Sequence, residues 1–403
     1  MNTRSLYNFI IVSLLVLSGG GIPFIFFRKP LLFLLLFLLM LGVIVQKRKL
    51  TVQMFRAHIV VFLLFSSFFV LNYLLAPFPQ SFQKVNGMLV ISGIAAFSVL
   101  FFRDRTTDFL NSLYSVLTVI LYHSLLGFAL YTFIALALID VSNQYYEFKS
   151  LAYVFYYIPN LYEYNFFGIN ICRSQGLFWE PGVLQIYLNI LLFLEMFVLK
   201  KSRLVMWMTV IAILTTYSST GVAVLCIQLL IYFTYILRKN ILLLPLISLG
   251  VFGMCQVTKT NIEEKVQGEK VFSFQKRLFD LLQPVYITYC NPILGVGFDD
   301  QQYKITRSSP EYSLILDQVN FENTEEGTSN SVMFLFAGGG LPLAIFFLLC
   351  LYRQTFVLEK RKWFFVFIII SLMTEPLFFR PIFMMLVFSG AIKILSTIKW
   401  KTY

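Results

Sequence analysis

The sequence predicts an all-α polytopic membrane protein with about twelve transmembrane helices. Of its 403 residues, 58% are hydrophobic and only 13% are charged, and 45 are phenylalanine. The apolar residues lie in runs of roughly 20, the length with which an α-helix crosses the hydrocarbon core of a bilayer. The net charge of +12 comes from short basic clusters between these runs. Such clusters orient membrane proteins, so nucleic acid is not an expected partner.

The apolar runs define the expected spans, whose ends are good to about four residues. They cover residues 7–27, 30–46, 56–76, 85–102, 109–139, 182–199, 204–217, 221–237, 240–257, 329–352, 363–379 and 381–398. The first begins like a signal peptide, but its apolar character continues through Ile22–Phe27. We therefore interpret it as an uncleaved helix. The fifth is too long for one upright span and must tilt or extend beyond the bilayer.

Basic residues indicate the orientation of these spans. With a cytoplasmic N-terminus, most of them fall on the inner side, including Arg4, Lys47, Arg48, Lys49, Arg103, Arg105, Lys200, Lys201, Arg203, Arg238, Lys239, Arg353 and Arg361. The short outer loops hold only Arg28, Lys29, Lys84 and Arg380. This asymmetry predicts that both termini are cytoplasmic. Merging spans 204–217 and 221–237 would move a basic cluster outside, so we count them separately.

Two long loops, at about 140–181 and 258–328, are expected on the outer side of a single integral membrane domain, residues 1–403. The first is dense in Tyr, Phe and Trp, which suit a membrane interface and also stack on sugar rings. The second contains an amphipathic stretch at 263–282 and then the turn-forming Asn291-Pro-Ile-Leu-Gly-Val-Gly297. We expect most charges of the second loop to be a solvated surface, with Arg277 as the exception.

The uncommon polar residues of the spans gather at the expected outer side, in five separate segments. These are Arg173 with Glu180, Tyr217–Gly221, Thr328–Ser331, Glu375 and Arg380. Glu180 precedes Pro181 and suits the N-terminus of a helix, where the dipole favours a carboxylate. Glu180 is therefore either a helix cap or a functional carboxylate, and Arg173 either an interfacial anchor or a ligand for an anion. Glu375 needs a cation, for which Arg380 and Arg173 are candidates.

The cysteines and histidines are expected to pack against neighbouring helices rather than to take part in catalysis. The five cysteines lack metal-ligand spacing, and both histidines, His58 and His123, lie in apolar runs. Asp299 and Asp300 resemble a metal-binding pair only weakly. We therefore expect neither a metal nor a cofactor. The string Gly-Gly-Gly-Ile-Pro at 19–23 recurs almost unchanged at 338–342, and glycines at such positions let neighbouring segments approach closely.

Four motifs occur in order along residues 170–350. They are Arg173-x-x-Gly176-x-Phe178-x-Glu180-Pro181, then Ser218-Ser-Thr-Gly221, then Arg277 with Asn291-Pro-Ile-Leu-Gly-Val-Gly-Phe298, and finally Ser329-Asn330. On a multi-span chain with two long outer loops, this combination resembles the superfamily of O-antigen ligases and Wzy-type polymerases. The first 140 residues resemble that superfamily only in hydropathy.

The resemblance implies an inverting, metal-independent glycosyltransferase of the membrane C-type, in the bacterial cytoplasmic membrane with its active site on the outer face. Its substrate would be an oligosaccharide carried on undecaprenyl diphosphate. A chain-length regulator and a flippase are candidate partners. The acceptor hydroxyl needs a base, and because the outer loops hold no histidine, Glu180 and then Glu375 are our candidates. Arg173, Arg277 and Arg380, with Asn330 and Ser218, would bind the diphosphate and the substrate.

One departure from the motifs of this superfamily bears on the choice between its polymerase and ligase activities. Many relatives carry a histidine just before the asparagine that Asn330 matches, but this chain has Ser329 there and no histidine in its outer loops. The departure excludes a histidine base and favours a repeat-unit polymerase over an O-antigen ligase. A lipid-linked oligosaccharide flippase is a weaker alternative, because a flippase should have short loops and ionisable residues along a central cavity.

Overall fold

The computed structural model is mostly helical, and several of its helices are apolar along their whole length. It describes residues 3–45, 52–134, 137–142, 147–159, 163–166, 169–237, 271–309, 311–312 and 328–397. Within these ranges, six helices are long and apolar enough to cross a membrane, at Arg28–Val45, Phe55–Leu75, Phe82–Phe102, Thr106–Tyr131, Pro181–Val198 and Ser331–Tyr352. A helical membrane protein is thus supported, whereas the count of about twelve spans stays a prediction. The expected span 240–257 lies outside the described residues.

The chain divides into two compact units, each of which is described by itself. Unit 1 comprises residues 1–28 and 110–263, and unit 2 comprises residues 29–109 and 264–403. The helices of unit 1 are α1 (Thr3–Leu17), α2 (Ile22–Phe26), α6 (Thr106–Ile134), α8 (Pro181–Phe193), α9 (Arg203–Thr215) and α10 (Ser219–Leu237), with a π-helical turn η2 (Leu194–Val198) after α8.

Helix α8 is the core of unit 1. Every residue from Val183 to Phe193 is buried, and α8 packs against both α9 and α10. Pro181 occupies the first turn, where its missing N–H costs no hydrogen bond, as the sequence predicts. The expected break between spans 204–217 and 221–237 is confirmed, because α9 ends at Thr215 and α10 begins at Ser219.

The first long loop contains β-structure, which the all-α prediction did not include. Strands β1 (Ile139–Ser142), β2 (Glu147–Leu151) and β3 (Phe155–Tyr157) form an antiparallel meander, and β4 (Glu163–Phe166) and β5 (Ile169–Cys172) form a hairpin. The meander is attached to α6, because the Tyr157 hydroxyl donates to the Gly127 carbonyl at 2.8 Å. Burial raises the pKa of Tyr157, so this hydroxyl stays a donor at neutral pH.

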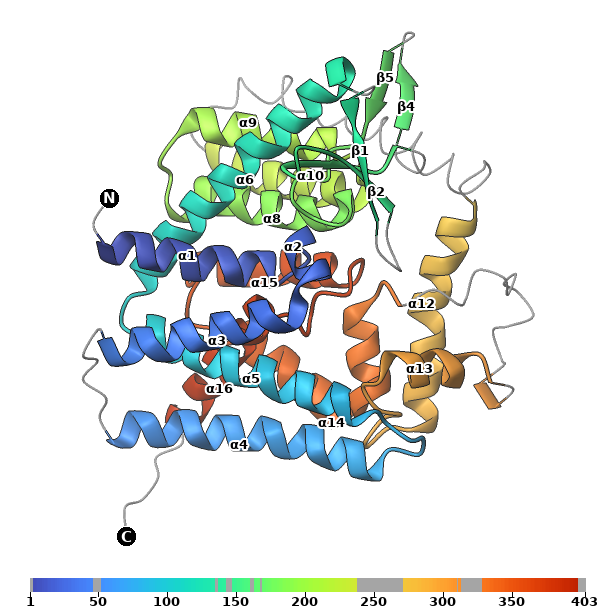
Figure 1. Ribbon diagram of the computed structural model, residues 1–403. Helices are drawn as coiled ribbons and strands as arrows, with labels where there is room; N and C mark the ends of the chain where they lie inside the picture. The colour runs from blue at the N-terminus through green and yellow to red at the C-terminus, as the bar shows by residue number, and fades with distance from the viewer. Residues whose placement is uncertain are drawn as a thin grey trace. The chain divides into compact units, whose positions relative to one another are not determined.

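Unit 2 is a helical bundle with an aromatic core. Its helices are α3 (Arg28–Val45), α4 (Val52–Leu75), α5 (Phe82–Phe102), α12 (Val271–Cys290), α13 (Asp300–Arg307), α14 (Ser331–Tyr352), α15 (Arg361–Leu372) and α16 (Pro381–Thr397). Helices α4 and α5 run side by side (Figure 1). Phe65 of α4 stacks on Phe388 of α16, with ring centroids 4.3 Å apart, and lies 4.7 Å from Phe347 of α14. Of the amphipathic stretch predicted at 263–282, residues 271–282 are helical as part of α12, and residues 263–270 lie outside the described residues.

Two expected single helices are interrupted at their glycine triplets. The first span, expected over 7–27, ends as α1 at Leu17 and resumes as α2 at Ile22, because Gly20 has a φ of +119°. Helix α14 is broken at Gly340, whose φ is +76°. Side chains other than glycine rarely adopt these backbone conformations. The prediction of an unbroken helix at each place was wrong for this reason.

We expect Gly340→Ala to destabilise the protein. A Cβ atom at this position would lie 2.3 Å from the Ile293 carbonyl oxygen, on a backbone with positive φ, and such strain costs about 1–3 kcal/mol. Gly87→Ala in α5 is the matched control, since a Cβ there meets no atom within 4 Å. Thermal melting of both variants in one detergent measures the difference. Equal melting temperatures would contradict the account.

Candidate functional site

The segment from Arg173 to Glu180 is held against the first glycine triplet of unit 1. Gly21 and Phe178 form an antiparallel β-bridge. The Ile22 amide donates to the Leu177 carbonyl at 2.8 Å, and the Trp179 amide donates to the Gly20 carbonyl at 3.1 Å. These bonds pair the backbone of a non-helical segment next to a buried helix, where an unpaired amide would be costly.

Glycine is required on the N-terminal side of this bridge. A Cβ at Gly19 would lie 1.8 Å from the Tyr187 hydroxyl oxygen, and a Cβ at Gly20 would lie 2.8 Å from Val183. Tyr187 donates its hydroxyl to the Gly19 carbonyl at 3.2 Å and stacks on Phe178, with centroids 4.7 Å apart. The interpretation that the triplet permits close approach is confirmed.

Arg173 joins this segment to the turn between α9 and α10. Its Nε donates to the Thr216 carbonyl at 2.8 Å, and the neighbouring Ser174 amide donates to the Thr215 carbonyl at 3.0 Å. Both carbonyls lie at the C-terminal end of α9, where the helix dipole favours a cation. Arg173 therefore ties this segment to the end of α9 through its Nε, whereas its role as an interfacial anchor stays a prediction.

Glu180 occupies the N-cap position of α8, but its side chain does not cap the helix. Oε1 instead accepts a hydrogen bond from the Trp179 indole Nε1 at 2.9 Å. The side chain is half-buried, and Oε2 accepts no hydrogen bond from the described part of the chain. One carboxylate oxygen is thus oriented by the indole, while the other is left for a further partner. This geometry suits a base better than a cap.

Ser218 has a structural role at the start of α10. Its Oγ accepts a hydrogen bond from the Gly221 amide at 3.3 Å, and its side chain is buried. A Cβ at Gly221 would lie 2.9 Å from Gln185 of α8. The sequence motif Ser218–Gly221 therefore forms a helix start that packs closely on α8, and it follows the turn to which Arg173 is hydrogen-bonded.

In unit 2, the residues at the head of α14 contact the turn between α15 and α16. Asn330 caps α14, since its Oδ1 accepts the Met333 amide at 2.9 Å. The Ser331 Oγ lies 2.7 Å from the Leu372 carbonyl oxygen and 2.8 Å from that of Glu375. It also accepts the Phe378 amide at 3.2 Å. The structure thus brings Asn330 next to the turn that carries Glu375, which is buried, and Arg380, which is half-buried.

A buried ion pair that the sequence analysis missed also holds the head of α14. Arg307 of α13 and Asp280 of α12 are 2.7 Å apart, with side chains only 2% and 1% exposed. The second oxygen of Asp280 accepts both the amide and the hydroxyl of Ser329, at 2.8 and 2.7 Å. Asp280 therefore fixes the residue that precedes Asn330. Its position on the buried face of an amphipathic helix was the available signal.

The charges of the second loop do not behave as one solvated surface. Arg277, the residue expected to be the exception, is exposed on α12, whereas Arg307 and Asp299 are buried. The expectation was wrong for Arg307 and Asp299, because Arg307 pairs with the buried Asp280 and Asp299 accepts the Ser81 amide from a segment distant in the chain. Glu322, Glu325 and Glu326 lie outside the described residues.

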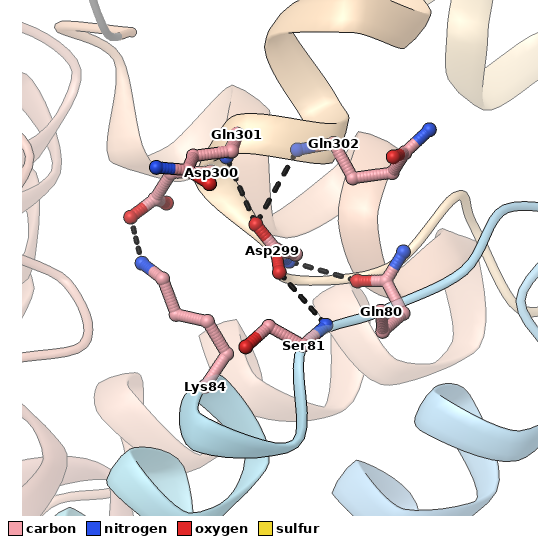
Figure 2. A network of polar contacts seen from close by, with 7 residues as sticks. All are labelled: Gln80, Ser81, Lys84, Asp299, Asp300, Gln301 and Gln302. Atoms are coloured by element: carbon pink, nitrogen blue, oxygen red, sulfur yellow. Dashed lines mark hydrogen bonds and ion pairs between the residues drawn. The ribbon is translucent and has the colours of Figure 1, made fainter.

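Asp299 and Asp300 serve structural contacts, which Figure 2 shows. One Asp299 oxygen caps α13 by accepting the Gln301 amide at 2.9 Å, and the other accepts the Ser81 amide at 2.8 Å. The Asp299 amide donates to Oε1 of Gln80 at 2.9 Å. Asp300 pairs with Lys84 at the surface. Within the described residues, no group of three potential metal ligands occurs.

Comparison with protein-family models, with curated proteins and with solved structures found no match to this chain. No related protein therefore assigns a role to the residues of the candidate site, and any role has to follow from their geometry. In unit 1, Glu180 lies at the N-terminus of α8, and Arg173 is bonded to the turn between α9 and α10 that holds Ser218. In unit 2, Asn330 caps α14 next to the turn that carries Glu375 and Arg380.

We expect Asp280→Ala to be strongly destabilising. It would leave the buried Arg307 without its counter-ion, which typically costs about 3–5 kcal/mol. Asp300→Ala, which removes a partly exposed ion pair, should cost no more than about 1 kcal/mol. Thermal melting compares the two. The double variant Asp280→Leu with Arg307→Met should recover part of the lost stability. If Asp280→Ala lowers the melting temperature no more than Asp300→Ala does, the buried ion pair has no structural role.

Proposed function

We propose that this protein polymerises oligosaccharide repeat units carried on undecaprenyl diphosphate into a surface polysaccharide, at the outer face of the bacterial cytoplasmic membrane. The observation that carries the proposal is that the segment ending in Glu180 at the start of the buried helix α8 is also bonded, through Arg173, to the turn between α9 and α10 that holds Ser218. Ionisable residues next to a membrane helix are costly, and function is the usual reason for their presence.

The reaction is a single displacement with inversion at the anomeric carbon. A hydroxyl oxygen of the acceptor sugar attacks this carbon, the bond from the carbon to the diphosphate oxygen breaks, and the electron pair leaves with the diphosphate. The hydroxyl proton passes to a carboxylate. Glu180 is our first candidate for this base, because its Oε1 is held by Trp179 while Oε2 is left to accept a proton. Glu375 is the second candidate.

Cationic side chains stabilise the negative charge that develops on the diphosphate. Guanidinium groups bind phosphate oxygens in pairs, so Arg173 is the candidate in unit 1, and Arg277 and Arg380 are the candidates in unit 2. Diphosphate is a good leaving group, and the reaction we propose uses no metal ion and no strong general acid. Asn330 and Ser218 are candidates for contacts to the substrate in addition to their roles as helix caps.

Deletion in the native host tests the function. Loss of a polymerase should leave single repeat units on the final acceptor, which gel analysis resolves from the normal ladder. Loss of a ligase should instead leave no polysaccharide on that acceptor, with long chains retained on the carrier lipid. Loss of a flippase should leave lipid-linked units facing the cytoplasm. Either of the last two results would contradict the proposal.

We expect Glu180→Gln to abolish chain extension in the complemented deletion strain at unchanged protein level. Glutamine keeps the shape and the hydrogen bond from Trp179 but cannot accept the proton, and loss of a general base typically lowers the rate by about 10²–10⁴-fold. Glu147→Gln, on the exposed side of β2, is the matched control and should leave the ladder intact. A normal ladder from Glu180→Gln would exclude this residue as the base.

Arg173→Ala and Arg173→Lys separate anchoring from catalysis. Both lose the geometry of the Nε bond to Thr216, but lysine retains a positive charge for the diphosphate. We expect Arg173→Ala to abolish extension and Arg173→Lys to retain part of it, at similar melting temperatures. If both variants produced wild-type ladders, Arg173 would have no role beyond structure.

A further inference from the structure

Helix α12 of unit 2 carries polar side chains on its buried face and apolar side chains on its exposed face. The buried face holds Asp280, Gln283 and Thr288, none of which is more than 6% exposed. The exposed face holds four large side chains that we call the α12 strip: Leu278, Leu282, Val285 and Tyr289. Their spacing of four, three and four residues places them on one side of the helix, and each is between 39% and 81% exposed. Such an arrangement is unfavourable in water.

Hydrogen bonds of the buried face fix the rotation of α12 about its own axis. Asp280 pairs with Arg307 and accepts two hydrogen bonds from Ser329. Gln283 Nε2 donates to the carbonyls of Arg307 and Tyr312, at 3.0 and 2.6 Å. Turning the α12 strip inward would break these bonds and leave buried polar groups unpaired, which is costly. The strip is therefore a fixed feature of the surface of unit 2.

The α12 strip adjoins the exposed face of a candidate membrane span. The turn that follows α12 exposes Ile293 and docks on α14, since the Leu341 amide donates to the Pro292 carbonyl at 2.8 Å. On α14, the exposed apolar face continues with Leu341, Ile345 and Leu349. Helix α14 is one of the six described helices that are long and apolar enough to cross a membrane. The medium that covers this face of α14 is thus the first candidate to cover the strip.

The direction and place of α12 suit a helix that lies along a membrane surface. Helix α12 runs across the direction that α4 and α5 share (Figure 1). The turn after it is held at one end of α4, because Asn72 Nδ2 donates to the Leu294 carbonyl at 2.7 Å and to the Gly338 carbonyl at 2.8 Å. Both α4 and α5 contain candidate membrane spans. A helix that lies across the ends of such spans is parallel to the bilayer plane, at the depth of an interfacial helix.

The polar residues that border the α12 strip also fit this depth. Arg277 is exposed beside Leu278, and a guanidinium group at the interface reaches the lipid phosphates while its neighbours stay in hydrocarbon. Tyr289 ends the strip, and tyrosine is enriched at the boundary between lipid and water. Apart from Arg277, the exposed residues of α12 that the structure describes carry no charge.

We propose that α12 is an interfacial helix whose strip is covered by the acyl chains of one leaflet of the bilayer. With the orientation that the basic residues predict, this is the outer leaflet. The occupant of the strip is lipid hydrocarbon rather than a second copy of the chain or a soluble partner. The inference goes beyond the proposed function and does not depend on it, because it concerns where part of the second long loop lies and not which reaction takes place.

Spin labels on the full-length chain in nanodiscs test this inference. A p-acetylphenylalanine that carries the label replaces Val285, and in a separate variant Leu282, so that the native cysteines stay in place. Oxygen concentrates in lipid, whereas a nickel chelate stays in water, and power saturation measures how often the label meets each. The lipid reference is a label at Ile345 of α14, and the water reference is a label at the exposed Gln301 of α13.

We expect the ratio of oxygen to nickel accessibility at Val285 and Leu282 to exceed that at Gln301 several-fold and to approach that at Ile345. A ratio equal to that at Gln301 would mean that water covers the strip, and the inference would fail. Low accessibility to both reagents would mean that protein covers it, either a second copy or another part of this chain, and would overturn it equally. Melting temperatures identify variants that do not fold, and the two labelled positions are read independently. The measurement needs no substrate, so its failure and that of the proposed function are distinguishable.

Discussion

Each unit of this protein depends on pairing a non-helical loop backbone with a glycine triplet. In unit 1, Leu177 and Trp179 exchange hydrogen bonds with Ile22 and Gly20. In unit 2, the amides of Val296 and Gly297 donate to the carbonyls of Ala337 and Gly338, at 2.9 and 3.0 Å. Backbone groups that leave a helix near a bilayer must find such partners, because lipid offers none. The two nearly identical strings at residues 19–23 and 338–342 therefore have the same structural role, which is to pair with the backbone of a non-helical loop.

These backbone pairings position the polar residues that we propose to carry the function. The bridge to Gly20 and Gly21 fixes Trp179, which orients Glu180, and the same segment carries Arg173 to the end of α9. In unit 2, the loop docked on the second triplet leads directly into Asp299 and α13, and α13 supplies Arg307 to the Asp280 pair at the head of α14. In both units, the charged groups are held by the close approach that glycine permits.

The features that follow local patterns could be predicted from the sequence. The start of α8 at Pro181 and the break at Ser218 depend on neighbouring residues, and both agree with the structure. The strands of the first loop were missed because each has three to five residues, too few for a reliable alternation pattern. The Asp280–Arg307 pair was missed because its partners are 27 residues apart and only tertiary packing brings them together. The helix breaks at Gly20 and Gly340 likewise depend on what docks against them.

The most direct measurement of the central claim is reconstitution. The purified protein is placed in proteoliposomes with an undecaprenyl-diphosphate-linked repeat unit from its own host, in the presence of a chelator of divalent cations. The account predicts carrier lipids bearing two or more repeat units, together with release of free undecaprenyl diphosphate in matching amount. Lipid-linked units that stay single in proteoliposomes holding folded protein would contradict it.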